Sequence, residues 1–203
     1  MSKLKEKKIE NIIGEYFKWN TLTERQKRRL LYKTKNEIFS WIKSFVIAFV
    51  LFIFVFSVLL VNAKVPSSSM EPTLMTNTRL IANRLAYSFG NEVEYNDIII
   101  FPAPDQKDIL YIKRVIGKSG DIIQIIDGIT YRNGDPIEEP YVNTQTGNYG
   151  PYVVPNGKIF VMGDNRNHSY DARFWENKYV DTNDIIGKAI FTYAPLKEIK
   201  LLK

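Results

Sequence analysis

An apolar run from Phe45 to Val61, interrupted by Ser57 alone, constrains this chain more than any other feature. Small or weakly polar neighbours extend the stretch to residues 44–63, about the length that an α-helix needs to cross a hydrocarbon core of roughly 30 Å. A buried helix of a soluble protein would show a polar stripe, which this run lacks. A cleaved signal peptide would have a shorter basic leader and usually a shorter apolar core. The sequence therefore predicts a retained transmembrane helix over residues 44–63.

Basic residues gather before this run. Residues 1–44 hold 12 Lys or Arg against 5 Asp or Glu, whereas residues 45–203 hold 16 against 17. Because basic flanks of a span stay in the cytoplasm, we expect a single-pass protein of the plasma membrane, with residues 1–43 inside and residues 64–203 outside. The lipid bilayer is then one partner. The almost neutral charge of the larger part argues against nucleic-acid binding.

The basic cytoplasmic segment is expected to be partly helical. Thr21, followed three positions later by Glu24, is typical of a capping box and predicts a helix from about residue 22. This helix would continue into the span. Its positive charge suits contact with anionic lipid headgroups.

Composition excludes several kinds of chemistry. The chain has no cysteine and a single histidine, His168. Thiolate zinc sites, iron–sulfur clusters, cysteine nucleophiles and multi-histidine metal sites therefore cannot form. We expect neither a metal nor a cofactor.

After the span the pattern is that of β-structure. Short runs rich in Ile, Val, Tyr and Phe alternate with tight-turn signals of the Asp-Gly and Asn-Gly type. The expected strands are Asp97–Phe101, Ile109–Ile116, Asp121–Ile126, Ile129–Arg132, Lys158–Met162 and Ile185–Tyr193. No long helical period lies between them, so the sequence predicts a mainly β, antiparallel domain over residues 64–203, tethered by one N-terminal transmembrane helix.

Three polar clusters in this domain are candidates for chemistry. Pro66–Leu74 holds three consecutive serines between two prolines, which fits either a linker or a nucleophile that needs a nearby base. Lys113 lies in a predicted strand beside Arg114, so one of two adjacent cations must point toward a largely apolar face. Lys113 is then either a rim lysine that reaches solvent or a desolvated amine able to act as a base. Residues 163–173 form either a polar surface loop or a hydrogen-bonded site.

Taken together, these clusters resemble the boxes of the type I signal peptidases, membrane-bound serine peptidases with a Ser–Lys dyad. Pro66–Leu74 resembles the nucleophile box, and Tyr111–Gly117 with Gly120-Asp121 resembles the lysine box. Gly163–Arg166, with the polar residues that follow it, resembles the third box. Their order and spacing agree across residues 64–195. Glu139-Pro140-Tyr141 and the single span are similar to the Gram-positive branch of the family.

The resemblance implies a role for each matched residue. Ser69 would be the nucleophile and Lys113 the general base. Ser67 would offer its hydroxyl to the oxyanion hole beside the Ser69 backbone N–H, and Ser169 would orient the Lys113 amine. The remaining matched residues are implied as structural support, Asp171 and Arg173 as a pair, together with Asp164 and Arg166.

The resemblance also implies the substrate. The chain would cut exported preproteins after an Ala-x-Ala-like site and so remove their signal peptides, close to the Sec translocase. Shallow apolar pockets that admit small side chains would be lined in part by Val65, Leu74 and Ile112.

Two other functions stay open at this point. One is a Ser–His–Asp hydrolase that uses His168 and Asp171. The other is a catalytically silent member of the family that acts as an assembly or binding factor. Intact Ser69 and Lys113 argue against the second, because a silent protein has no chemical need for either.

Overall fold

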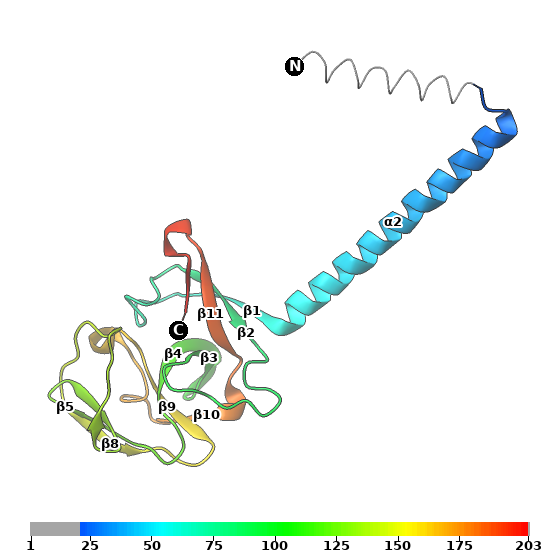
Figure 1. The fold of residues 1–203 in the computed structure, drawn as a ribbon. Coiled ribbons are helices and arrows are strands. Elements are labelled where there is room, and N and C mark those ends of the chain that lie inside the picture. The colour runs from blue at the N-terminus through cyan, green and yellow to red at the C-terminus, as the bar shows by residue number, and fades with distance from the viewer. Residues whose placement is uncertain (1–20, 203) are drawn as a thin grey trace. The chain divides into compact units, whose positions relative to one another are not determined.

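The computed structural model describes residues 21–202 and divides the chain into two compact units, Met1–Phe54 and Val55–Lys203. The helix α2 (Glu24–Leu59) supplies all the described helical residues of the first unit (Figure 1). It is the one helix in the described part of the chain that is long and apolar enough to cross a membrane, and its apolar side chains are exposed.

The start of α2 corrects the predicted capping box. Thr23, not Thr21, is the capping residue: the Thr23 backbone N–H donates to Gln26 Oε1 at 2.9 Å, and the Gln26 N–H lies 3.4 Å from Thr23 Oγ1. The reciprocal pair therefore joins Thr23 to Gln26, because Gln26 is the residue three positions into this helix. Residues 1–20 of the predicted cytoplasmic segment lie outside the described residues.

The end of α2 corrects the predicted span. The helix stops at Leu59, and the four last residues assigned to it belong to strand β1 (Leu60–Lys64). β1 pairs with β2 (Arg79–Asn83) from Leu60↔Asn83 to Lys64↔Arg79. Val61 and Ala63 pack against a buried apolar cluster. Sheet pairing and this packing outweigh the local apolar pattern, which fits a helix and a buried strand equally well.

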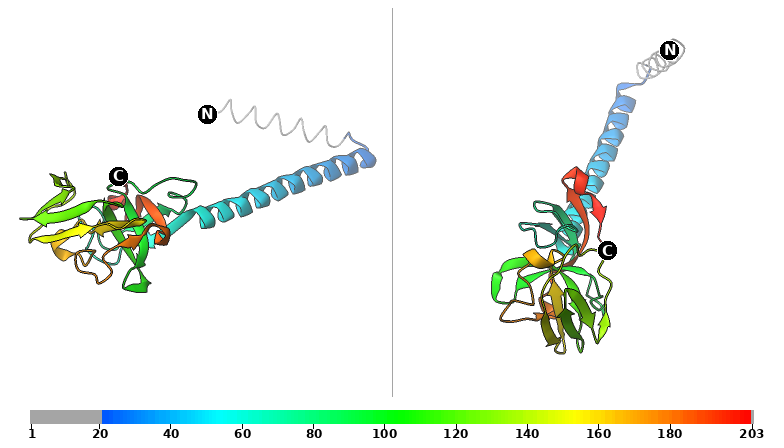
Figure 2. Two further views of the ribbon diagram at one scale, coloured as in Figure 1. Left: turned by 90° about the horizontal axis from the view of Figure 1, so that it is seen from below. Right: turned by 90° about the vertical axis from the view of Figure 1, so that its left-hand side faces the viewer.

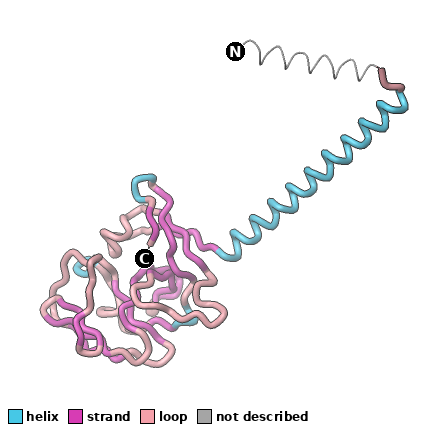
Figure 3. The backbone as a smooth tube through the Cα atoms, in the orientation of Figure 1, coloured by secondary structure: helices cyan, strands magenta, loops and turns pink. Residues whose placement is uncertain are grey.

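The second unit is mainly antiparallel β-structure, as predicted (Figures 2 and 3). Within the described residues its larger sheet has the order β1-β2-β11-β3-β4-β9-β10, with β12 paired to β11, and its smaller sheet has the order β7-β6-β5-β8. The further strands of the larger sheet are β3 (Ile98–Ala103), β4 (Gln106–Gly117), β9 (Lys158–Met162), β10 (Val180–Asp181), β11 (Gly187–Ala194) and β12 (Lys200–Leu201). The smaller sheet comprises β5 (Ile122–Ile126), β6 (Ile129–Arg132), β7 (Asp135–Pro136) and β8 (Tyr149–Val153).

The six predicted strands are present, with small shifts at their ends, and the missed strands have weak local signals. β2 begins with Arg79 and ends with Asn83, and β8 contains Gly150 and Pro151, residues that disfavour strands. These segments become strands because a neighbouring strand pairs with them.

The core has two apolar clusters, on opposite faces of the central strand β3. Ile98 and Ile100 join the cluster that includes Val65, Met70 and Leu74, whereas Ile99 and Phe101 join a larger cluster that includes residues of β5 and β9. Residues on both faces of β3 and of the second half of β4 are buried, from Ile112 to Gly117 in β4. A side chain on β4 is therefore held in a fixed place.

Candidate active site

The serine-rich segment is a packed turn and not a loose linker. Val65, Met70 and Leu74 are 3%, 1% and 0% exposed and anchor it in the apolar cluster. The Val65 N–H donates to the carbonyl oxygen of Thr78 at 2.9 Å, and the Leu74 N–H donates to that of Met70 at 2.8 Å. Buried apolar residues before and after the three consecutive serines thus fix the backbone that carries the serine hydroxyls.

Ser69 and Lys113 meet in this buried environment. The Nζ atom of Lys113 lies 2.6 Å from the Oγ atom of Ser69, and the two residues are 4% and 9% exposed respectively. Lys113 is held on β4 by the register Lys113↔Ile99, so it extends from the buried part of the sheet. No carboxylate forms a salt bridge with Lys113 in residues 21–202.

Burial changes the protonation of Lys113. Desolvation disfavours the ammonium form and outweighs the raising effect of the Asp171 and Asp164 carboxylates, so the pKa of Lys113 falls from 10.5 to about 8. At a pKa of about 8, about one tenth of the amine is neutral at pH 7 and about half at pH 8. A neutral amine at hydrogen-bond distance from a serine hydroxyl can accept its proton.

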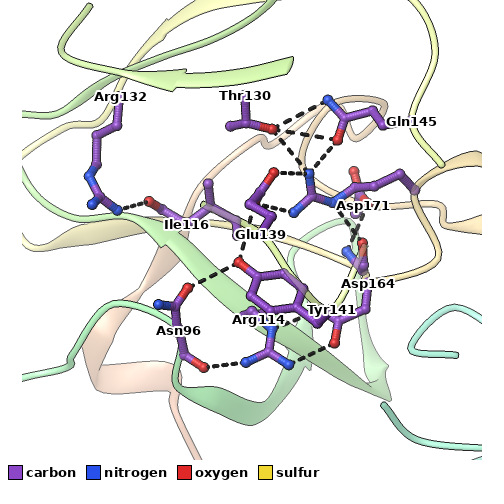
Figure 4. Close-up of polar contacts among 12 residues, drawn as sticks. Asn96, Arg114, Ile116, Thr130, Arg132, Glu139, Tyr141, Gln145, Asp164 and Asp171 are labelled. Atoms are coloured by element: carbon purple, nitrogen blue, oxygen red, sulfur yellow. Dashed lines mark hydrogen bonds and ion pairs between the residues drawn. The ribbon is translucent and has the colours of Figure 1, made fainter. Parts of the chain in front are cut away.

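Arg114, the second of the adjacent cations, is also buried, and it is paired. Its Nε and Nη2 atoms donate to the two carboxylate oxygens of Asp164 at 2.9 and 2.7 Å (Figure 4). The ring of Tyr141 covers its guanidinium, with 3.9 Å from Cζ to the ring centroid. Sequence reasoning gave Arg114 no role. Its position beside Lys113 in a strand predicted to be buried could have indicated a buried ion pair, because an arginine stays charged and needs a buried counter-ion.

The predicted structural residues of the third box form several ion pairs. Asp171 and Arg173 pair with each other, with 2.8 Å between Oδ1 and Nε, and both are buried. Asp164 pairs with Arg114, whereas Arg166 pairs with Glu139 of the preceding loop and also donates to Gln145. Residues 163–173 are therefore held in place by ion pairs and hydrogen bonds and do not form a free surface loop.

Ser169 is buried beside the dyad, but its hydroxyl has no hydrogen-bond partner within the described part of the chain. A side chain at Gly163 would overlap the Ser169 Oγ and the Ser69 carbonyl oxygen. Gly163 therefore lets the third box approach the nucleophile. The predicted lysine-orienting bond from Ser169 is not formed in this structure.

Donors for an oxyanion lie next to Ser69. The Ser67 hydroxyl lies 3.3 Å from Ser69 Oγ. Among residues 21–202, none accepts a hydrogen bond from the Ser69 backbone N–H. The Ser69 N–H is thus available to a substrate carbonyl, whereas the Ser67 hydroxyl donates to Ser69 Oγ and must turn from it to reach such a carbonyl.

His168 does not complete a Ser–His–Asp triad. It is exposed, and its Nδ1 lies 3.3 Å from Asn165 Oδ1. The carboxylate of Asp171 is occupied by Arg173 and by the Gly163 N–H. The described residues therefore bring Lys113, and not His168, to the Ser69 hydroxyl.

A cleft of about 590 Å³ opens over Ser69 and Lys113. Val65 and Ile112, two of the residues expected in the substrate pocket, line this cleft together with residues of β1 and of β4 such as Tyr111. Leu74 does not: it is 0% exposed and packs beneath the cleft with Val65 and Ile112. Among the described residues there is no group of three or more acidic or histidine side chains placed to hold a metal.

Comparison with known proteins shows which family the chain is similar to. The family described as "Signal peptidase, peptidase S26" matches residues 38–194. Signal peptidase I of Bacillus licheniformis is 36% identical over 177 residues, 82% of this chain and 94% of that protein. Signal peptidase I T of Bacillus subtilis strain 168 is 35% identical over 195 residues, 91% of this chain and 97% of that protein. A crystal structure of a signal peptidase I from Enterococcus faecalis V583 matches with 28% identity and a TM-score of 0.43, covering 48% of this chain and 97% of that one.

Proposed function

The chain belongs to the signal peptidase family, peptidase S26, and from this premise we propose that it removes signal peptides from exported preproteins with Ser69 as nucleophile and Lys113 as general base. The observation that carries the proposal is the 2.6 Å distance between Lys113 Nζ and Ser69 Oγ in a buried site. A buried lysine without a carboxylate partner lowers the stability of the fold, so the position of Lys113 is best explained by a catalytic role.

The reaction proceeds through an acyl-enzyme. The neutral Lys113 amine takes the Ser69 hydroxyl proton as Oγ forms a bond to the scissile carbonyl carbon, and the carbonyl electrons move to oxygen. When the tetrahedral intermediate collapses, the C–N bond breaks and the Lys113 ammonium returns the proton to the leaving amine. Water then attacks the acyl carbon and gives a proton to the Lys113 amine. As the second tetrahedral intermediate collapses, the bond between this carbon and Ser69 Oγ breaks, and the Lys113 ammonium returns the proton to Ser69 Oγ.

Two donors stabilise the negative charge that develops on the carbonyl oxygen. The Ser67 hydroxyl and the Ser69 backbone N–H both lie at the nucleophile. Fixed donors of this kind contribute several kcal/mol to the transition state, because they need no reorganisation when the charge appears.

The cleft supports cleavage after an Ala-x-Ala-like site. Val65, Ile100 and Ile112 line it near the dyad. These residues are in contact with the packed core, so the pockets cannot deepen to take large side chains. Small residues before the scissile bond are the ones that fit.

The helix α2 supports anchoring in the lipid bilayer. The charge asymmetry around it supports an orientation with residues 64–203 outside the plasma membrane, the side on which preproteins would emerge from the Sec translocase. Ser69 follows the end of α2 at Leu59 by ten residues, so a short stretch of chain joins the nucleophile to the anchoring helix. Protease added to intact spheroplasts should degrade a C-terminal tag and spare an N-terminal one; the reverse pattern would overturn the orientation.

Cleavage of a preprotein by the full chain in detergent tests the catalytic proposal. The new N-terminus of the product, read by sequencing, should follow an Ala-x-Ala-like site. Ser69→Ala should abolish cleavage, and Lys113→Met should lower the rate by at least about 10²–10⁴-fold, the usual contribution of a positioned base. His168→Ala is the matched control and should keep most activity. An active Lys113→Met protein beside an inactive, folded His168→Ala protein would exclude the dyad.

A further inference from the structure

One residue of the third box touches the nucleophile segment directly. The Asn165 backbone N–H donates to the carbonyl oxygen of Ser69 at 3.1 Å, and its side-chain Nδ2 donates to the carbonyl oxygen of Ser68, also at 3.1 Å. A single residue thus binds two consecutive carbonyl groups, on either side of the nucleophilic serine.

The side-chain bond acts on the peptide unit that matters most. The Ser68 carbonyl and the Ser69 N–H belong to the same planar trans peptide, in which C=O and N–H point in opposite directions. The Ser68 carbonyl oxygen accepts from the Glu71 backbone N–H at 3.1 Å as well as from Asn165 Nδ2, and these two bonds together fix the direction of the carbonyl and therefore that of the N–H. A hydrogen bond to the carbonyl also polarises the peptide and makes its N–H a stronger donor.

Asn165 is itself held firmly. Asp164, the residue before it, accepts two hydrogen bonds from buried Arg114 (Figure 4). Arg166, the residue after it, pairs with Glu139 and donates to the Gly163 carbonyl oxygen. Both flanking residues are 1% exposed. The end of the Asn165 amide that faces Ser68 is Nδ2, as its bond to the Ser68 carbonyl oxygen shows.

We infer that Asn165 is a positioning residue of the oxyanion hole: through its Nδ2 it aims and polarises the Ser69 backbone N–H. This inference rests on the proposed function, because it assumes that the Ser69 N–H receives the developing oxyanion. The buried ion pairs of the third box then contribute to catalysis indirectly, because they hold Asn165 in the position from which it orients this peptide.

The test compares two Asn165 variants with a matched control from the same loop. Asn165→Ala removes the Nδ2 donor but keeps the backbone bond to Ser69. Asn165→Asp keeps the shape and replaces the donor by an oxygen that cannot donate. Asn167→Ala is the control, because Asn167 is exposed and its side chain contacts Thr144 and Thr146 away from the dyad.

The readouts are kcat, KM and the rate ratio between two peptide substrates, one with the normal scissile carbonyl and one with sulfur in place of its oxygen. Sulfur accepts hydrogen bonds weakly, so an intact oxyanion hole favours the oxygen substrate. We expect both Asn165 variants to lose about 10–10²-fold in kcat on the oxygen substrate with KM little changed. Their oxygen-to-sulfur ratio should fall, whereas Asn167→Ala should match the wild type.

The outcomes separate this inference from the proposed function. If Lys113→Met is inactive while both Asn165 variants behave like Asn167→Ala, the role of Asn165 is excluded and the dyad stands. An equal loss on the two substrates would make Asn165 a purely structural residue and would also exclude the inference. If Asn165→Ala does not fold, as judged by its melting temperature, the isosteric Asn165→Asp decides alone. An active Lys113→Met would overturn the dyad and the inference together.

Discussion

Arg114 and Asp164 form a bidentate ion pair in which both side chains are at most 2% exposed, and this pair connects the strand of the dyad lysine to the third box. The two residues are 50 positions apart in the chain. Because each neighbours a residue of the site, Lys113 on one side and Asn165 on the other, their pairing sets the spacing between base and nucleophile segment.

Removing one partner of this pair should be strongly destabilising. Arg114→Met leaves the Asp164 carboxylate buried without a counter-ion, which costs about 3–5 kcal/mol. Urea unfolding of the full chain in detergent should show this loss, and the double variant Arg114→Met/Asp164→Leu should recover part of it. Lys158→Met is the control, because its pair with Asp181 is exposed and contributes at most about 1 kcal/mol. Equal effects of Arg114→Met and Lys158→Met would contradict this account.

The pH dependence of catalysis should report the lowered pKa of Lys113. Only the neutral amine can act as a base, so kcat/KM should rise about tenfold per pH unit below 8 and level off above it. His168→Ala should keep the same midpoint. A midpoint near 6.5, the ordinary value for an imidazole, that disappears in His168→Ala would point to the histidine instead.

Buried Lys113 should lower the free energy of unfolding at neutral pH. The folded-state pKa of Lys113 is about 8 and the unfolded value is 10.5, so the unfolded chain binds more protons between these limits. The penalty is complete below pH 8 and disappears as the pH rises through 10.5. Lys113→Met removes the buried charge, and its melting temperature should therefore exceed that of the wild type at pH 7. The difference should shrink above pH 10; a variant less stable than the wild type at pH 7 would refute this.

Two serine variants can test whether the Ser67 hydroxyl contributes to the oxyanion hole or is merely close to Ser69. Ser67→Ala removes a hydroxyl 3.3 Å from Ser69 Oγ and should lower kcat by about 10²–10³-fold with little change in KM. Ser68→Ala is the matched control in the same turn, because its side chain makes no hydrogen bond within residues 21–202. Similar rates for the two variants would remove Ser67 from the mechanism.

Much of the site could be predicted because its chemistry is local. The serine-rich turn, the lysine of β4 and the polar loop each carry a recognisable pattern of residue types, and their order along the chain is specific even without a structure. The antiparallel β-domain also follows from alternating apolar runs and tight turns. Asn165 was not singled out, because its importance depends on which carbonyls its amide meets.

The partners of the buried charges could not be predicted in the same way. Four ionisable residues of the third box offer several possible pairings, and the sequence gives no preference between Asp164–Arg166 and Asp164–Arg114. The register of β4 against β9, where Arg114 lies opposite Met162, brings Arg114 to Asp164. Such long-range contacts are decided by how strands align, and many alignments are compatible with one pattern of apolar residues.

The sequence by itself determined that one long apolar helix precedes a β-domain with a serine and a lysine in characteristic surroundings, because periodicity and composition act over a few residues. Only the tertiary structure decided that α2 ends at Leu59, that Leu74 lies beneath the cleft, and that Lys113 is dry enough for its pKa to fall to about 8. Burial is a property of the whole packed domain. Lys113 is shielded from water because β4 is paired on both sides and covered on both faces. The same local sequence at a sheet edge would leave the lysine in solvent.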